Sequence, residues 1–313
     1  MIQSLNLVFC GTPHFAVPTL ERLVEAGFQV QLVVTQPDRP KGRGLELVPS
    51  PVKQCALKLE LPVNQPESIK SNDTFRAQLI ALKPDAIIVV GYGRIIPRWM
   101  LDLPPLGNIN LHASLLPKYR GAGPIQWAIA RGETLTGVTT MKIDAGLDTG
   151  DILLQQEISI APNETAETLA PKLAAVGSDL TVETLHGLRT GAVHPRKQNN
   201  AEATLAPILK KEDGLVDFSR PAVEILNRMR GFQSWPGAYS TFRGKNLQLK
   251  KAAALDQSLP ISELKMEGDR LVVGCGQGTT IELFELQLEG KKRISAADFI
   301  RGYRPLSGEK LGA

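Results

Sequence analysis

Short apolar runs alternate with amphipathic stretches through the first two hundred residues. An uninterrupted apolar run is typical of a strand that is buried on both faces. Longer stretches with apolar residues three and four positions apart are typical of helices. The pattern predicts strands at Leu5–Cys10, Val30–Thr35, Ala86–Val90, Asn108–His112 and Gly137–Ile143, and helices at Ala16–Glu25, Pro51–Lys58, Phe75–Leu82, Pro124–Arg131 and Ala166–Arg189. This alternation favours an α/β fold with a doubly wound, mostly parallel, Rossmann-like sheet.

The pattern changes after residue 190. Residues 191–207 stay polar and lack clear periodicity, which is typical of a linker. The short alternating runs beyond them are separated by Gly, Pro and Asp, which favours a smaller C-terminal β-barrel, OB-like or similarly half-open. This region is predicted to hold a helix at Pro221–Met229 and strands at Ala238–Phe242, Leu247–Ala253, Leu271–Cys275 and Thr280–Leu286. We therefore expect one domain over residues 1–190 and a second over residues 208–313.

Composition narrows the class of protein. The chain has 313 residues, 42% apolar and 22% charged, as is usual for a globular protein. Its longest apolar runs fall short of the roughly 18–20 residues that a membrane span needs. No basic residue precedes the first strand, so no secretory signal is expected. Three scattered cysteines match no metal-ligand spacing. We expect a cytoplasmic protein without a metal.

The positive charge is concentrated in the C-terminal third. Residues 208–313 carry 17 Lys and Arg against 13 Asp and Glu, which accounts for the whole net charge of +4. A basic region of this kind suits contact with a polyanion. A mildly basic, solvated surface explains the charge equally well.

The strand predicted at Asn108–His112 ends in polar residues on one face. Asn110 and His112 are two positions apart, so their side chains leave the same side of the strand. An amide beside an imidazole can hold a carbonyl and move a proton, which is typical of acyl transfer. A lone histidine at a strand end is more often structural, and His14, His186 and His194 are predicted to be so.

A carboxylate that could orient His112 lies in the turn at residues 144–151. Asp144, Asp148 and Asp151 all fall within this glycine-interrupted segment. An aspartate between glycines commonly caps its own turn. Spacing alone does not decide which of the three carboxylates orients His112.

Two glycine turns and one long connection offer binding loops. The turns at Gly11 and Gly91 follow predicted strands but lack the further glycines of a dinucleotide fingerprint, which disfavours nicotinamide or nucleoside-triphosphate chemistry. Their exposed main chain suits a flat heterocycle. Residues 36–51 form a connection far longer than the usual 2–6 residues or so, and its Arg39, Lys41 and Arg43 suit phosphate or base contacts. A loop without a partner would carry the same composition.

Two motifs resemble the signature of the folate-dependent formyltransferase superfamily. They are Asn110-x-His112-x-Ser114-Leu115-Leu116-Pro117 with Tyr119-Arg120-Gly121, and Asp144-x-Gly146-x-Asp148-x-Gly150. Along nearly its whole length the chain resembles the methionyl-tRNA formyltransferase family, including the loop at residues 37–53 and the segment at 217–239. That family often has Trp at the position of Phe218. The resemblance implies that Asn110, His112 and Asp148 form the catalytic trio.

The same resemblance implies a reaction. The formyl group of 10-formyltetrahydrofolate is transferred to the methionine amino group of initiator methionyl-tRNA for translation initiation. The Asn110 amide and a His112 N–H would donate to the oxyanion. Asp148 would orient His112, favour its charged form and position a water. Whether His112 or a water is the immediate base stays open.

The resemblance also assigns binding residues and partners. Folate contacts are expected at Gly91, Tyr92, Gly93, Arg94, Ile95, Ser114, Leu115, Leu116, Pro117 and Asp144. Contacts to tRNA are expected at Arg39, Lys41, Gly42 and Arg43, with further contacts in the C-terminal domain. A monomer without membrane or metal is expected. Two other readings are a formyltransferase acting on an amino-sugar nucleotide and a non-catalytic tRNA-binding module.

Overall fold

The computed structural model describes residues 4–41 and 46–312, and these fold into two compact units. The first unit holds the chain up to Gly121, Leu135–Ser159 and Ala170–Ala206. The second holds Ala122–Thr134, Ile160–Leu169 and the chain from Pro207. Because the units interleave along the sequence, the domain limits at residues 190 and 208 stay a prediction. No helix in the described ranges is long and apolar enough to cross a membrane.

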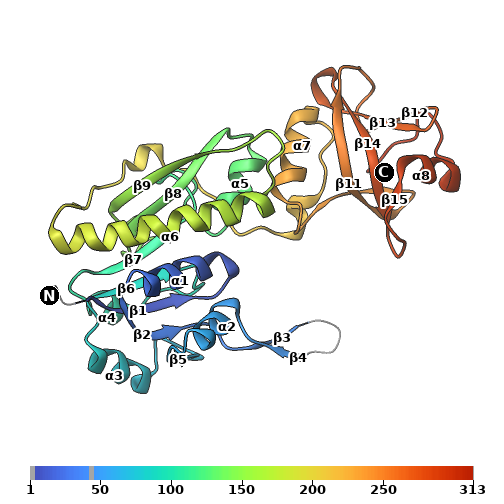
Figure 1. Cartoon of the computed structure of the whole chain (residues 1–313). Coiled ribbons are helices and arrows are strands. Elements are labelled where there is room, and N and C mark those ends of the chain that lie inside the picture. The colour runs from blue at the N-terminus through green and yellow to red at the C-terminus, as the bar shows by residue number, and fades with distance from the viewer. Residues whose placement is uncertain (1–3, 42–45, 313) are drawn as a thin grey trace. The chain divides into compact units, whose positions relative to one another are not determined.

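A seven-stranded sheet forms the centre of the first unit (Figure 1). Its strand order is β5-β2-β1-β6-β7-β8-β9. The strands are β1 (Asn6–Gly11), β2 (Gln29–Val34), β5 (Val63–Asn64), β6 (Ala86–Val90), β7 (Asn108–His112), β8 (Leu135–Lys142) and β9 (Ile152–Ser159). Neighbours from β5 to β7 are parallel, and β7-β8 and β8-β9 are antiparallel. The predicted doubly wound, mostly parallel α/β sheet is confirmed.

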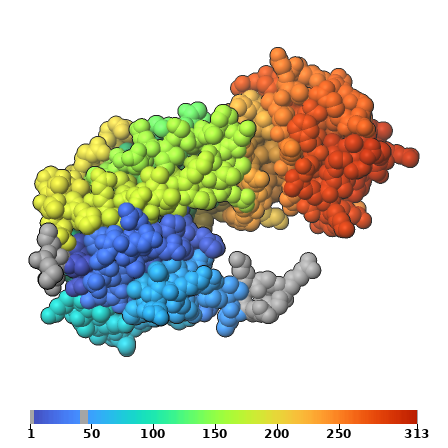
Figure 2. All heavy atoms as spheres, viewed as in Figure 1, coloured from blue at the N-terminus to red at the C-terminus, as the bar shows by residue number. Residues whose placement is uncertain are grey.

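Helices cover both faces of this sheet. They are α1 (Val17–Glu25), α2 (Pro51–Lys58), α3 (Asp73–Leu82), α4 (Arg98–Leu101) and α6 (Ala166–Thr190), with a short 3-10 turn, η1 (His14–Ala16). On one face, Phe75 of α3 and Met100 of α4 pack with Val89 of β6. On the other, the hydroxyls of Thr184 in α6 and Thr140 in β8 lie 2.7 Å apart. In the space-filling view, blue residues from the N-terminal part of the chain lie directly against yellow-green residues (Figure 2).

Two segments of the first unit differ from their sequence-based prediction. Within the long connection, β3 (Arg39–Lys41) and β4 (Glu46–Val48) pair antiparallel. The segment predicted as a linker contains a 3-10 turn, η2 (Asn200–Glu202), and pairs with the unit at Arg196↔Ile152 and Arg120↔Leu205. These contacts use main-chain groups, which leave no periodic signal in the sequence. The segment is therefore bonded to the first unit as far as Ala206.

An antiparallel sheet forms the centre of the second unit. Its order is β10-β11-β14-β13-β12, and β15 pairs with β14. The strands are β10 (Ala238–Phe242), β11 (Lys245–Leu255), β12 (Leu264–Glu267), β13 (Arg270–Gly274), β14 (Thr280–Leu288) and β15 (Ile294–Ser295). The helices are α5 (Pro124–Ala130), α7 (Ala222–Gly231) and α8 (Ala296–Tyr303), with 3-10 turns η3 (Lys211–Gly214) and η4 (Gly276–Gly278).

The chain end bridges the two edges of the second sheet. The Gly308 N–H donates to the Leu264 carbonyl of β12 at 3.0 Å, and the Gly312 N–H donates to the Thr241 carbonyl of β10 at 3.0 Å. Inside, Phe299 of α8 is fully buried, and its ring centroid lies 5.1 Å from that of Phe242. The predicted smaller β domain is confirmed as a half-open barrel around an apolar core.

Candidate active site

The carboxyl end of β7 places two polar side chains on one face of the sheet. Asn110 pairs in register with Val89 of β6 and is half-buried. Within residues 4–41 and 46–312 its amide has no hydrogen-bonding partner. His112, two positions further, is 5% exposed. An unpaired amide beside a buried imidazole is available to an incoming ligand.

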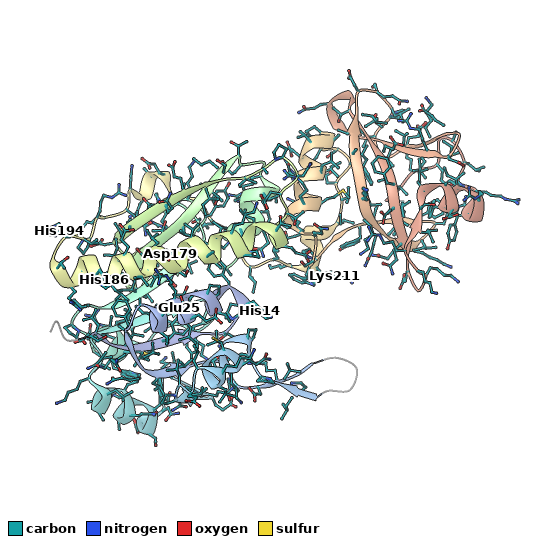
Figure 3. All side chains as sticks on the ribbon, viewed as in Figure 1. His14, Glu25, Asp179, His186, His194 and Lys211 are labelled. Carbon is teal, nitrogen blue, oxygen red and sulfur yellow. The ribbon has the colours of Figure 1, made fainter. Side chains whose placement is uncertain are left out.

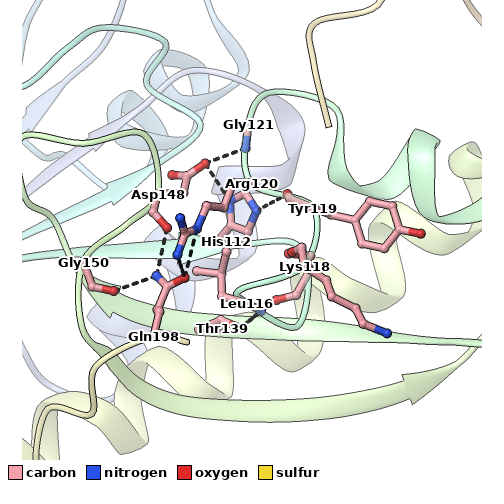
Figure 4. Close-up of polar contacts among 11 residues, drawn as sticks. His112, Leu116, Lys118, Tyr119, Arg120, Gly121, Thr139, Asp148, Gly150 and Gln198 are labelled. Carbon is pink, nitrogen blue, oxygen red and sulfur yellow. Dashed lines mark hydrogen bonds and ion pairs between the residues drawn. The ribbon is translucent and has the colours of Figure 1, made fainter. Parts of the chain in front are cut away.

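Both ring nitrogens of His112 face groups of the protein (Figure 4). Nε2 lies 2.9 Å from the carbonyl oxygen of Tyr119, and because a carbonyl only accepts, Nε2 carries the hydrogen. Nδ1 lies 3.7 Å from Oδ2 of Asp148. This separation is too long for a direct hydrogen bond, so Nδ1 is the ring atom that remains able to meet a ligand. The predicted N–H donation from His112 to substrate is therefore limited to Nδ1.

The three candidate carboxylates have different surroundings. Asp144 accepts hydrogen bonds from Gly146 N at 3.0 Å and from the Thr149 hydroxyl at 2.7 Å, so it caps its own turn. Asp151 contributes its main-chain carbonyl to Lys142 N. Asp148 faces His112. The geometry thus brings one of the three aspartates to the imidazole.

Asp148 is held in an unusual backbone conformation. Its φ is +51°, in the left-handed region that non-glycine residues adopt infrequently. Its Oδ2 accepts a hydrogen bond of 2.8 Å from the Gly121 N–H. Gly121 itself has φ +119°, and a Cβ there would lie 2.5 Å from the Ala206 carbonyl. The glycine of the first motif is therefore required for the loop that meets Asp148.

The loop after β7 is fixed by Thr139 of β8 (Figure 4). The Thr139 hydroxyl donates to the Ser114 carbonyl at 2.6 Å and accepts from Leu116 N at 3.1 Å. The Ser114 hydroxyl donates to the Lys118 carbonyl at 2.6 Å. Ser114 and Leu116 are buried. The Ser114 hydroxyl and the Leu116 N–H thus fix the loop, and the folate contacts at Ser114, Leu115, Leu116 and Pro117 stay predictions.

The loop after β6 lies where the strand order reverses, between β1 and β6. Gly91 has φ +56° and Gly93 has φ +76°. The Arg94 guanidinium donates to Gln36 Oε1 at 3.1 Å and to the Glu67 carbonyl. Ile95 is 91% exposed. An exposed apolar side chain beside glycine main chain at a sheet switch point suits a flat ligand.

The side chain of Tyr92, in the loop predicted to bind folate, is buried. Its ring packs with the core around Phe75 and Met100, and the residue is 2% exposed. Burial raises the pKa of the Tyr92 hydroxyl above its ordinary range. Its carbonyl already accepts from the Gln36 amide at 3.1 Å. The buried ring leaves only the main chain of Tyr92 to meet a folate, and the predicted contact at Tyr92 stays a prediction.

Of the predicted tRNA contacts, Arg39 and Lys41 lie on β3. Arg39 is exposed, whereas Gly42 and Arg43 lie outside the described residues, and Lys41 is described only by its main chain. At the base of the hairpin, Lys53 Nζ lies 2.5 Å from Asp38 Oδ2. The Gln65 amide donates to the other Asp38 oxygen at 2.7 Å. This pairing joins the entrance of the connection to α2 beyond it.

Two residues that sequence reasoning did not place in the site lie beside Asp148. Gln198 donates to the main-chain carbonyls of Asp148 and Gly150, and Arg120 donates to Gln198 (Figure 4). Arg120 belongs to the motif Tyr119-Arg120-Gly121, so the sequence could have indicated its place in the site. Gln198 lies in the polar stretch that reads as a linker.

The other histidines belong to different segments of the chain. Figure 3 places His14, His186 and His194 on separate parts of the chain. His186 packs against Phe28, with ring centroids 5.1 Å apart. In the described part of the chain, no group of three or more His, Cys, Asp or Glu residues could hold a metal ion.

Family models match the chain in two stretches. The model described as formyl transferase matches residues 5–185, and that of the formyl transferase C-terminal domain matches residues 208–304. Two relatives are methionyl-tRNA formyltransferases. That of Koribacter versatilis is 67% identical over 306 residues, covering 98% of each chain. That of Acidobacterium capsulatum is 61% identical over 312 residues, covering 99% of this chain and 100% of the relative.

A solved structure shares the fold at low sequence identity. It is the N-formyltransferase from Helicobacter canadensis, solved with folinic acid and dTDP-3-aminofucose. Its TM-score is 0.67 at 20% identity, covering 89% of this chain and 98% of the other. The chain described here belongs to the methionyl-tRNA formyltransferase branch of the formyl transferase family.

Proposed function

We propose that this enzyme transfers the formyl group of 10-formyltetrahydrofolate to the amino group of methionine on initiator methionyl-tRNA. The observation that carries the proposal is the match to methionyl-tRNA formyltransferases over nearly the whole chain. The matched region contains the His112–Asp148 pair. In the reaction, the amine nitrogen attacks the formyl carbon and loses a proton, the bond from that carbon to the folate nitrogen breaks, and the folate nitrogen gains a proton. We also propose that it acts as a monomer in the cytoplasm.

The loop after β6 has the features that a folate site needs. The exposed Ile95 side chain would cover one face of the pterin, and the main chain around Gly91 and Gly93 would meet its polar edge. Arg94 is turned toward Gln36 and Glu67, so we assign it to holding the loop. When bound, the folate supplies the activated formyl group.

The three polar residues divide the remaining work. The unpaired amide of Asn110 donates to the formyl oxygen as negative charge develops there. With Nε2 donating to the Tyr119 carbonyl, Nδ1 of His112 is the atom that exchanges a proton with the amine, directly or through a water. The carboxylate of Asp148, at 3.7 Å, stabilises His112 when Nδ1 is protonated.

The hairpin and the C-terminal unit supply contacts to tRNA in this proposal. Arg39 and Arg43 offer guanidinium groups, which pair well with phosphates. The net charge of +4 beyond residue 207 attracts the RNA backbone, and this attraction weakens as salt rises. A small amino-sugar acceptor would need neither feature.

An acceptor assay tests the proposed function. The purified protein is incubated with 10-formyltetrahydrofolate and initiator methionyl-tRNA, elongator methionyl-tRNA or a dTDP-amino sugar. We expect formylation of the initiator tRNA, and a loss of about 10²–10⁴-fold in kcat for His112→Ala. The exposed His194→Ala serves as the matched control. Formylation of the amino sugar in preference to the tRNA would overturn the proposal.

A further inference from the structure

The segment Tyr119–Gly121 contacts both members of the His112–Asp148 pair. The Tyr119 carbonyl accepts from Nε2 of His112, and the Gly121 N–H donates to Oδ2 of Asp148. The residue between them, Arg120, is a buried cation with 7% exposure. The position of this segment therefore affects the separation of Nδ1 from the carboxylate.

The Arg120 side chain binds the segment that follows α6. Its Nε and Nη2 donate to Gln198 Oε1 at 3.1 and 2.7 Å, and Nη2 also donates to Asn200 Oδ1 at 2.8 Å. The main chain adds to this attachment, because Arg120 N donates to the Thr204 carbonyl at 2.9 Å. Residues 198–204 thus hold the loop that contacts His112.

Gln198 extends the same network to the Asp148 turn. Its Nε2 donates to the Asp148 carbonyl at 2.8 Å and to the Gly150 carbonyl at 2.7 Å. Both amide hydrogens and the amide oxygen are therefore used. The two donations hold the main chain at Asp148, which has a left-handed conformation and lies outside the helices and strands. The Gln198 side chain thus joins the Arg120 loop to the Asp148 turn.

We propose that Gln198 is a positioning residue for the reaction, acting with Arg120. It fixes the main chain of Asp148, and through it the carboxylate relative to Nδ1 of His112. This inference rests on the proposed function, since it assigns Asp148 a role in the same site.

Two substitutions of Gln198 separate positioning from structural support. Gln198→Ala removes every contact. Gln198→Glu still accepts from Arg120 but has no N–H for the carbonyls of Asp148 and Gly150. His194→Ala is the control, because His194 is exposed in the same stretch and lies outside residues 198–204.

The measurements are kcat, KM for each substrate, the melting temperature and the ¹⁵N shifts of the His112 ring. We expect both Gln198 variants to lose about 10–100-fold in kcat with each KM within about twofold of wild type. Gln198→Glu should shift the Nδ1 resonance and lose more activity than its change in melting temperature explains, whereas the control should keep the wild-type kcat, melting temperature and Nδ1 resonance.

The inference fails if Gln198→Glu keeps the wild-type kcat and Nδ1 shift. It also fails if the loss of kcat across the variants is explained by the loss of melting temperature alone, because Gln198 would then only stabilise the fold. Failure of wild-type protein to formylate the tRNA would instead contradict the proposed function. The Nδ1 shift still tests the link from Gln198 to His112 in that case.

Discussion

Two regions of the molecule are stabilised by different interactions. One is the edge of the first sheet formed by the carboxyl end of β7 and the loop after it, called the sheet edge below, and the other is the barrel of the second unit. At the edge, buried polar groups are joined by hydrogen bonds. His112, Ser114, Arg120 and Thr139 are all below 10% exposure, and each has a partner. In the barrel, the buried positions of the strands are mostly apolar, and Phe299 packs against Phe242 and Tyr303.

This difference has an energetic consequence. Removing one partner from a buried hydrogen-bonded pair leaves the other unsatisfied, which costs about 1–3 kcal/mol, and the geometry changes with it. Apolar cores tolerate volume-conserving changes at lower cost. We infer that the sheet edge needs one fixed arrangement for chemistry, whereas the barrel provides a stable surface whose charge matters more than its detailed packing.

The largest effect is expected from removing charge at the sheet edge while keeping its shape. Asp148→Asn retains an oxygen that accepts from Gly121 N, so the loop should stay in place. It loses the negative charge that stabilises His112 once Nδ1 is protonated. We expect kcat to fall about 10²–10⁴-fold, with little change in melting temperature or in tRNA binding. Wild-type kcat in this variant would exclude an electrostatic role for Asp148.

A core truncation tests the other side of the comparison. Phe299→Ala should lower the free energy of unfolding of the second unit by about 3–5 kcal/mol, because a fully buried ring is lost. Hydrogen exchange of full-length protein is the measurement. Amides of β11 and β14 should exchange faster, while those of β6 and β7 keep their protection. Equal loss in both units would show that the whole chain unfolds as one.

The apolar strands could be predicted from sequence, and the polar contacts could not. Ala86–Val90 and Asn108–His112 were predicted with the bounds that the structure has, because an uninterrupted apolar run or a motif fixes them. The strand β9 was missed, since its run of Gln155, Gln156 and Glu157 has neither an apolar core pattern nor a turn signal. The hairpin of β3 and β4 was missed because its strands are only three residues long and β3, Arg-Pro-Lys, has no apolar alternation.

The candidate site, too, could be predicted only in part from the sequence. Strand alternation places Asn110 beside His112, but spacing left three carboxylates, and the choice depends on which aspartate caps its own turn. Gln198 lies fifty residues beyond Asp148 in a polar stretch. Its role comes from two hydrogen bonds to main-chain carbonyls, which no residue pattern encodes.

The smallest effect is expected at the base of the hairpin, where an ion pair and a hydrogen bond hold Asp38. Hydrogen bonds from Lys53 and Gln65 lower the pKa of Asp38, so their stabilising contribution is complete above the unfolded value near 3.9 and is lost as pH falls through the lower, folded value. Asp38→Asn removes the ion pair at neutral pH. We expect a loss of about two- to fivefold in kcat/KM for tRNA, in keeping with the modest energy of a partly exposed pair, and unchanged KM for the folate. Titration of the Asp38 carboxyl carbon by NMR checks the cause, and a midpoint above 3.9 would contradict it. Lys70→Ala, an exposed charge away from the hairpin, is the control.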